Sequence, residues 1–307
     1  MEYRDLLSEL KFYTRAKNSE RKHYMQKIQA KQPVNSSANL VDFSSKRTVL
    51  EPGIAVPADE LSYGRYTVRF ARSGNEINQA VYVQHRVFNL ELLSEFLIPG
   101  FDDSEFEIPS SADCRYLIVL ESATENVVGS YRIRTFEMAK TAENFFSSGV
   151  FRLSDLPSTV LSQAIEISRL CILPEHRNKQ VLFLLWKGLA KHLLKTKKRY
   201  LFGCCSIFTQ DFGDACAAFD LLRRGAFLHD KYVVSPTEEC EFSEEEKFLS
   251  KTPANFVLPK LFGSYLKMGA KICSKPAIDR DFKTVDFFML FDIKAISEKY
   301  FKMFFTS

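Results

Sequence analysis

The segment Ile165–Leu194 (IEISRLCILPEHRNKQVLFLLWKGLAKHLL) constrains the fold more than any other part of the chain. An apolar strand carrying Glu166 and Arg169 runs through Pro174 into a polar loop, and an apolar helix follows from near Asn178. This order places free backbone N–H groups, at the positive end of a helix dipole, beside a strand that bears a carboxylate. Such a corner can hold an anionic carrier while a base acts on a nucleophile nearby. The segment therefore predicts group transfer from a phosphate-bearing donor.

The rest of the chain alternates between strand-like and helix-like patterns. A hairpin comes early and a strand–helix–strand unit follows, so the expected fold class is α/β, a mixed central sheet with helices on both faces. We expect residues 61–307 to form this domain, with an exposed acidic insertion near 230–255, and residues 1–60 to form a basic helix and a linker. The predicted strands are 66–72, 115–122, 127–136, 165–172, 199–208, 271–278 and 284–293, and the predicted helices are 75–92, 178–196, 215–224 and 259–270.

Composition and charge exclude several classes of protein. A chain of 307 residues that is 46% hydrophobic can bury a substantial core, and a net charge of +4 is too mild to indicate a nucleic-acid partner. The seven cysteines show no CxxC spacing, so we expect reduced thiols in a cytoplasmic protein and no metal site. The N-terminus lacks the apolar core of a secretory signal, and no apolar run approaches the roughly 20 residues that span a bilayer.

Several motifs, in register along the chain, carry a resemblance to a known family. The segments VVGSYRIRT, EISRLCILPEHRN, LLWKGLAKHL and RYLFGCCSI resemble the bacterial ornithine-lipid N-acyltransferases of the GNAT superfamily. Glu166-x-x-Arg169, preceded by Arg86, is also similar to acyl-homoserine-lactone synthases and N-acyl amino acid synthases. The resemblance implies a GNAT-like fold. It also implies transfer of a fatty, often 3-hydroxylated, acyl group from a phosphopantetheine thioester to an amino acid's amine, with ornithine as the expected acceptor.

The loop expected to hold the donor departs from the family pattern. The usual pyrophosphate loop reads Arg/Gln-x-x-Gly-x-Gly/Ala, whereas the matching run here is RNKQVL, residues 177–182. Glycine lets the backbone approach a pyrophosphate closely, so its absence favours acyl carrier protein over coenzyme A as the donor, with no permanently bound cofactor. The predicted phosphate site consists of the Arg177 side chain and the backbone N–H groups of Asn178, Lys179, Gln180 and Val181.

Glu166 and Arg169 are the predicted catalytic residues. A carboxylate in an apolar strand is costly unless it is bonded or paired, and we expect Glu166 to take a proton from the acceptor, since only the neutral amine attacks a thioester. The alternative is a structural Glu166–Arg169 ion pair, which needs a bulge because residues three apart on a regular strand point to opposite faces. Arg169 is expected to bind the acceptor's carboxylate or to help hold a donor-site loop, and the alternative is an arginine that only braces the fold.

Three further residues are predicted to contact substrate. Arg86 lies among apolar helical neighbours, and Cys204 and Ser206 end a strand that borders the acyl-thioester channel in the resembled fold. The thiols are expected to be packed and to have a raised pKa, which favours direct transfer over an acyl-cysteine intermediate.

Charged and aromatic helices suggest possible partners. Lysines at 187, 191, 195 and 198 could steer an acidic acyl carrier protein or form a solvated face. The basic N-terminal helix and the aromatic stretch 300–305 could touch the inner face of a membrane or pack as ordinary helices. The alternative functions are a signal synthase of the N-acyl amino acid or homoserine-lactone type, and a non-catalytic module that binds acyl chains or membranes.

Overall fold

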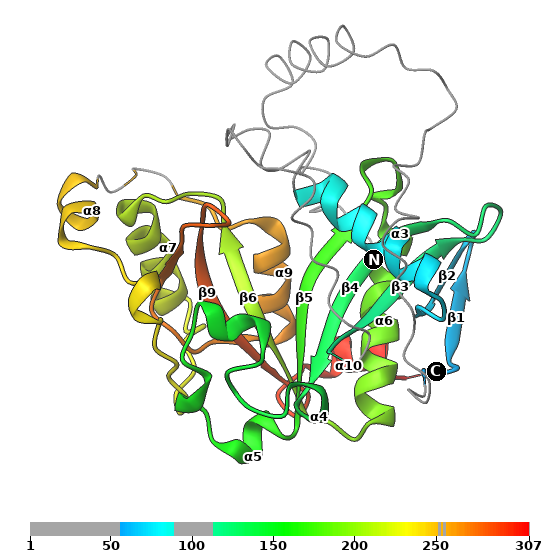
Figure 1. Cartoon of the computed structure of the whole chain (residues 1–307). Helices are drawn as coiled ribbons and strands as arrows, with labels where there is room; N and C mark the ends of the chain where they lie inside the picture. The colour runs from blue at the N-terminus through cyan, green and yellow to red at the C-terminus, as the bar shows by residue number, and fades with distance from the viewer. Residues whose placement is uncertain (1–55, 89–112, 251–252, 254–255, 307) are drawn as a thin grey trace, which may run out of the picture. The chain divides into compact units, whose positions relative to one another are not determined.

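A mixed nine-stranded sheet forms the centre of the described part of the chain (Figure 1). The computed structural model describes residues 56–88, 113–250, 253 and 256–306. Strand order is β1-β2-β3-β4-β5-β6-β9-β7, with β8 also paired to β9, and β5–β6 is the parallel pair of this sheet. The strands are β1 (Glu60–Tyr63), β2 (Tyr66–Phe70), β3 (Arg115–Glu121), β4 (Val127–Thr135), β5 (Ala164–Ile172), β6 (Tyr200–Ile207), β7 (Lys271–Ile272), β8 (Ala277–Asp279) and β9 (Thr284–Asp292).

Helices cover both faces of the sheet, as the sequence predicts. Tyr116 and Ile118 of β3 pack in one core cluster with α3, whereas Leu117 between them lies against Gly188 of α6. Successive strand residues point to opposite faces, so α3 and α6 lie on opposite sides. The helices are α3 (Gly74–His85), α4 (Phe136–Ala139), α5 (Ser158–Leu161), α6 (Lys179–Lys195), α7 (Phe212–Arg224), α8 (Glu244–Leu249), α9 (Lys260–Met268) and α10 (Glu298–Phe305), with short 3₁₀ turns η5 (Phe146–Gly149), η6 (Leu153–Asp155), η7 (Pro174–His176) and η8 (Glu238–Cys240).

The long helix α6 anchors its face of the sheet. Its buried residues recur at three- and four-residue spacing, which gives one apolar stripe against β1 to β5. Trp186 in this stripe donates to the Tyr131 hydroxyl, which lies 2.5 Å from that of Tyr265 on α9. The C-terminal helix α10 packs on α6 through Phe304, whose ring centroid is 5.5 Å from that of Trp186. The aromatic stretch 300–305 therefore contributes at least one side chain to ordinary packing.

The α3 side carries a second core under β6 and β9. Phe202 and Phe288 stack with centroids 5.4 Å apart, and the loops of α4, η5, η6 and α5 close over them. The segment 230–255 was predicted to be an exposed insertion, and this is wrong for its first half. Val234, Cys240 and Phe242 are buried, because the chain returns here to bridge Phe151 and complete the core.

Some helices and strands begin or end at other residues than the sequence predicts. The helix expected over 75–92 ends as α3 at His85, and residues 89–92 lie outside the described residues, as do 1–55 with the predicted basic helix and most of the linker. The short strand β1 begins at Glu60, at the end of the segment predicted as linker. The stretch 271–278 forms two short strands rather than one. Within the described ranges, no helix has the length and apolar character needed to cross a bilayer.

Candidate active site

Strands β5 and β6 part after a short parallel contact. Their register pairs Ala164 with Tyr200 and ends at Glu166 with Phe202, and Figure 1 shows the two strands close at one end and separated at the other. Backbone groups of β5 beyond Glu166 stay paired with β4 on one side only. At the branch point Gly203 approaches so closely that an added Cβ would lie 2.3 Å from the Ile167 carbonyl oxygen. The place predicted for the acyl thioester, between 165–172 and 199–208, is therefore where the sheet opens.

A bulge in β5 sets the position of Arg169. The β4–β5 register shifts between Ser130 and Arg132, and Arg169 has a positive φ of 54°. Its half-buried guanidinium lies 4.0 Å from the ring centroid of Phe282 and 5.0 Å from that of Phe88. Among the described residues no carboxylate forms an ion pair with it, although the Asp279 charge reaches it. Burial and the neighbouring Arg132 charge lower the pKa of Arg169 to about 10, so it remains a cation at neutral pH. An incoming carboxylate could therefore pair with this guanidinium.

Glu166 is fully buried and accepts three hydrogen bonds from η5. One carboxylate oxygen accepts from the Ser147 amide (2.6 Å) and hydroxyl (2.7 Å), and the other accepts from the Phe146 amide (3.0 Å). Burial raises the pKa of Glu166, while these hydrogen bonds and the Arg132 charge oppose the rise. The bulge that a Glu166–Arg169 pair would need is present, but the two side chains do not form an ion pair. The arrangement offers a carboxylate that holds η5 in place rather than one that faces an incoming amine.

Two more arginines line the same face of the sheet. The Arg132 guanidinium lies 3.4 Å from the ring centroid of Phe146 and donates to the Ser168 hydroxyl (3.1 Å). The Arg134 guanidinium lies 3.8 Å from the same ring centroid. Because Glu166 fixes η5, it also fixes Phe146 between these cations. The result is a rigid, positively charged wall next to Arg169.

The predicted residues Cys204 and Ser206 lie on this face of β6. Burial raises the pKa of Cys204 well above that of a free thiol, in agreement with the expectation of a packed thiol. Ser206 is in register with Asp286 of β9, and the Ser206 hydroxyl interacts with that carboxyl. These side chains therefore bring a carboxyl group into the area that the sequence argument did not include.

Asp286 is the functional candidate that the sequence reasoning missed. It is 4% exposed, and its Oδ1 atom has no hydrogen-bond partner in the described part of the chain. Burial raises its pKa to about 6, with the Asp279 charge adding to the rise, whereas the Ser206 and Thr284 hydroxyls and the Arg169 charge oppose it. The signal was available in the segment TVDFFMLFD, where one acidic residue interrupts an apolar strand just as Glu166 does in β5.

The predicted phosphate loop lies at the N-terminus of α6, and most of its donors make hydrogen bonds within the protein. Asn178 caps the helix, and its side-chain oxygen accepts from the backbone N–H groups of Gln180 (2.9 Å) and Val181 (3.2 Å). The Arg177 side chain donates to the Ile172 carbonyl. In the described part of the chain, the Lys179 backbone N–H is the predicted donor that makes no such internal bond, so a phosphate would have to displace the Asn178 cap. The loop as it stands is not an open anion cradle.

Val181 packs the start of α6 against β4. It is fully buried, and an added Cβ at Gly129 of β4 would lie 3.0 Å from its side chain. The two loop positions at which the family pattern has small residues hold Gln180 and Leu182 here, and an added Cβ at Gly64 would lie 3.0 Å from the Gln180 side chain.

The comparisons with known proteins agree with this architecture. A family model described as an acetyltransferase (GNAT) domain matches residues 83–187, which include β3, β4, β5 and the start of α6. The fold is that of a GNAT acyltransferase. An L-ornithine N(alpha)-acyltransferase of Rhizobium meliloti (strain 1021) is 29% identical over 277 residues, covering 86% of this chain and 92% of that protein. An L-ornithine N(alpha)-acyltransferase of Brucella abortus (strain 2308) is 27% identical over 254 residues, covering 77% and 88%. The resemblance drawn from the sequence motifs is confirmed by these relatives.

A solved structure shows a weaker likeness. The structure of FeeM, an N-acyl amino acid synthase from uncultured soil microbes, covers 75% of this chain and 92% of that chain, with 11% identity and a TM-score of 0.40.

Arg86 lies beside the loop that leads into the predicted phosphate site. It forms the C-cap of α3, and its guanidinium pairs with Glu175 of η7 at 3.1 Å on the surface. The pair links the end of α3 to the loop that precedes α6. Arg86 is therefore placed to brace that loop, and its predicted contact with substrate has no support in the geometry.

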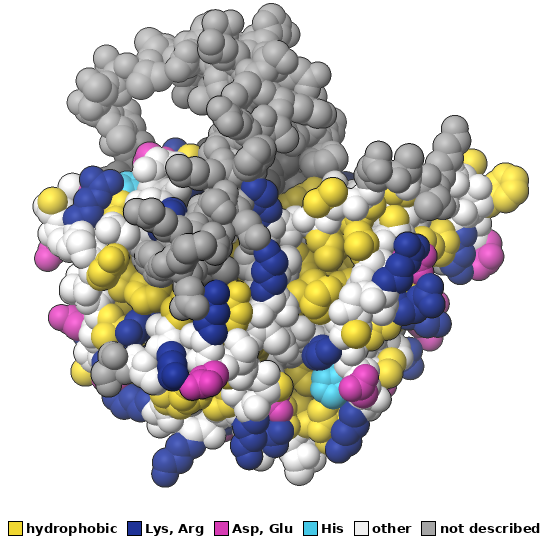
Figure 2. Space-filling view, turned by 180° about the vertical axis from the view of Figure 1, so that it is seen from behind, with side chains coloured by type: hydrophobic (Ala, Val, Ile, Leu, Met, Phe, Trp, Pro, Cys, Tyr) yellow, Lys and Arg dark blue, Asp and Glu magenta, His cyan; other side chains and the backbone are white. Residues whose placement is uncertain are grey.

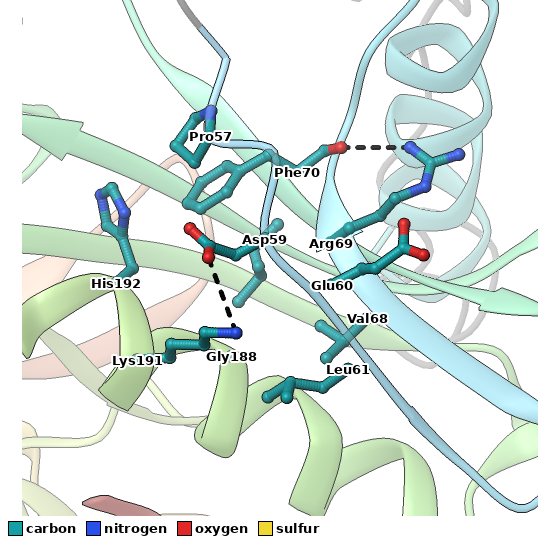
Figure 3. A pocket seen from close by; sticks show the side chains of 11 residues that line it. Pro57, Asp59, Glu60, Leu61, Val68, Arg69, Phe70, Gly188, Lys191 and His192 are labelled. Atoms are coloured by element: carbon teal, nitrogen blue, oxygen red, sulfur yellow. Dashed lines mark hydrogen bonds and ion pairs between the residues drawn. The ribbon is translucent and has the colours of Figure 1, made fainter. Parts of the chain in front are cut away.

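The lysines predicted to dock a partner are mostly paired within the molecule. Lys191 and Lys195 lie 3.6 Å and 2.5 Å from Asp59, beside a small recess between β1, β2 and α6 (Figure 3). Lys198 lies beyond the end of α6 and pairs with Glu137. In Figure 2 the basic side chains lie in small groups with acidic ones among them rather than in one continuous patch. These contacts favour the reading of the lysines as a solvated face.

Proposed function

We propose that this chain is an L-ornithine N-acyltransferase, which joins a long-chain, 3-hydroxylated acyl group to the α-amine of ornithine in aminolipid synthesis. The proposal is supported by relatives of that name that align over most of the chain and by the GNAT fold. The structural observation that carries it is the Arg169 guanidinium, which has no carboxylate partner among the described residues and is held by a bulge next to the parted strands. Such a group suits the α-carboxylate that distinguishes an amino acid from other amines.

The thioester is proposed to lie along β5 beyond Glu166. Backbone groups there are not paired with β6, so they can bond the amide groups of a pantetheine arm and support the oxyanion of the tetrahedral intermediate. Arg132 and Arg134, with Phe146 between them, add positive potential to the same wall. Glu166 is proposed to act as a positioning residue, because it fixes η5 and through it the Phe146 ring.

Acyl carrier protein is proposed as the donor in preference to coenzyme A. A pyrophosphate needs several free N–H groups at close range, and the α6 start has its Gln180 and Val181 N–H groups capped by Asn178. A single phosphate on a carrier protein makes a smaller demand on this loop. We place the reaction in the cytoplasm, in keeping with seven free cysteines, of which five are buried.

Purified full-length protein tests the proposal directly. It is incubated with ornithine and a 3-hydroxyacyl thioester of either acyl carrier protein or coenzyme A, and products are identified by mass spectrometry. We expect N-acyl ornithine, formed faster with the carrier-protein thioester. No N-acyl amino acid with either donor would contradict an acyltransferase and favour a module that only binds acyl chains.

Two matched variants test the role of Arg169. Arg169→Lys keeps the charge but loses the planar fork, and we expect the KM for ornithine to rise by about 10-fold to 100-fold. Arg280→Lys is the control, because Arg280 pairs with Glu246 on the surface. A KM for ornithine that stays within threefold in Arg169→Lys would remove Arg169 from the acceptor site.

A further inference from the structure

We propose that Asp286 is the catalytic base, which takes the proton from the α-ammonium of the acceptor. The inference rests on the proposed function and assigns a step of that reaction to a residue outside the resembled motif. Asp286 lies on β9, in register with Ser206 of β6, on the same side of the sheet as Cys204 and Glu166. Its Oδ1 atom is buried and has no partner in the described residues.

A base needs a lone pair that the protein has not already used. Glu166 already accepts three hydrogen bonds from η5, whereas the Oδ1 atom of Asp286 accepts none from the described residues. Leaving a buried carboxyl oxygen without a partner costs stability, and proteins retain such groups where a substrate supplies the missing bond. Of the two acidic residues buried in the central strands, Asp286 is therefore the one prepared to receive an ammonium.

The groups around Asp286 favour binding of a zwitterion. The charges that reach it come from Arg169 on β5 and Asp279 on β8, and the thiols of Cys204, Cys205 and Cys240 stand nearby on β6 and η8. Arg169 would attract the carboxylate of an α-amino acid, whose ammonium is attached to the same carbon. A cation and an anion in electrostatic contact can thus hold both charged groups of one small molecule.

Titration of Asp286 also suits the task. Burial raises its pKa to about 6, so it is mostly ionised at neutral pH yet basic enough to accept a proton. Asp279 faces it with a second carboxylate, whose oxygen accepts from the backbone N–H groups of Asp281 and Phe282. That oxygen is committed to a turn and is not offered to a ligand.

The proposed acyl transfer moves two protons from the ammonium, one to Asp286 and one to the departing thiol. Asp286 takes one proton from the ammonium, and the neutral amine attacks the thioester carbon to form the C–N bond. The tetrahedral intermediate collapses, the C–S bond breaks with its electron pair on sulfur, and the second proton lost by nitrogen ends on the thiol. Asp286 returns its proton to water when the amide leaves. No oxidant or further reactant is required.

Asp286→Asn and Asp220→Asn form the test and its control. Asp220 pairs with Arg223 and Arg224 on the surface of α7, so this control should change kcat by no more than about threefold. Asp286→Asn should lower kcat by about 10²-fold to 10⁴-fold with little change in the KM for ornithine, and the acid limb of the kcat/KM profile near pH 6 should vanish. Wild-type kcat and an unchanged acid limb would overturn the proposal.

A second variant guards against a purely structural loss. In Asp286→Ala the deleted carboxyl leaves room for formate, and added formate should restore part of the rate if Asp286 moves a proton. Loss of activity in both folded variants without rescue by formate would assign Asp286 a structural role and overturn the proposal. If wild-type protein acylates ornithine and Asp286→Asn is fully active, the assignment of Asp286 as the base is wrong and the proposed function stands. If wild-type protein acylates no amino acid, the proposed function and the base are both wrong.

Discussion

Gly203 marks the point where β5 and β6 separate, and its replacement by alanine should destabilise the sheet there. The added Cβ would lie 2.3 Å from the Ile167 carbonyl oxygen, about 1 Å closer than the 3.4 Å at which ordinary contact begins. The neighbour is backbone, so neither strand can yield by rotating a side chain. The strands must move apart by roughly 1 Å, and the last parallel pair, Glu166 with Phe202, adjoins the contact.

The expected loss of stability is about 2 to 4 kcal/mol. Overpacking of a tight site costs about 1–3 kcal/mol, and weakening one adjacent backbone hydrogen bond adds about 1 kcal/mol. For a domain of this size, each kcal/mol lowers Tm by roughly 2–4 °C, so Gly203→Ala should melt roughly 5–15 °C below wild type.

Thermal unfolding followed by circular dichroism measures the effect, and Gly263→Ala is the matched control. Gly263 lies inside α9, and an added Cβ there meets nothing within 4 Å, so alanine should be neutral or stabilise by up to about 1 kcal/mol. A Gly203→Ala protein that melts within 2 °C of wild type, with Gly263→Ala behaving as expected, would refute the close approach of the two strands.

Three more substitutions test the local arguments. Asn178→Ala removes the cap of α6 and should cost about 1–2 kcal/mol in urea unfolding, whereas unchanged stability would mean that the cap is not formed. Glu166→Gln places an amide against the donors of Ser147, so Tm should fall by the equivalent of about 1–3 kcal/mol, and a wild-type Tm would contradict the role of Glu166 in holding η5. Burial and the Arg115 charge lower the pKa of His192 from 6.5 to about 4, so the folded protein binds fewer protons than the unfolded chain in that window. The free energy of unfolding should therefore fall by up to about 3 kcal/mol as the pH drops from 6.5 to about 4, and His192→Leu should lose this dependence. Parallel curves of stability against pH for the two proteins would contradict a buried, neutral His192.

The elements of the fold follow from local patterns and were predictable. The hairpin of β3 and β4, the strand β5 and the helix α6 each carry a hydrophobic period and end signals within their own sequence. The segment 230–255 was predicted to be exposed because it is rich in acidic residues. Its apolar residues Val234 and Phe242 nevertheless pack into the core. Burial of a few apolar residues in an irregular segment depends on distant strands, and no local period records it.

The candidate site was predictable in place but not in detail. An acidic residue within an apolar strand indicates a buried carboxylate, and both Glu166 and Asp286 meet that description. Glu166 was predicted as the base because a carboxylate in an apolar strand is costly unless it is bonded, and Asp286 was not considered. Residues 146 and 147, some twenty positions earlier in the chain, bring three donors to Glu166, and no local pattern records this.

By itself the sequence determined the order of strands and helices, the helices on both faces and the presence of charged groups within the sheet. The tertiary structure decided which of those groups accepts three hydrogen bonds and which has an oxygen without a partner among the described residues. It also decided that β5 bulges at Arg169 and parts from β6 at Gly203. The physical reason is that periodicity is a property of neighbouring residues. Hydrogen-bond partners and strand spacing are set by segments that meet only after the chain has folded.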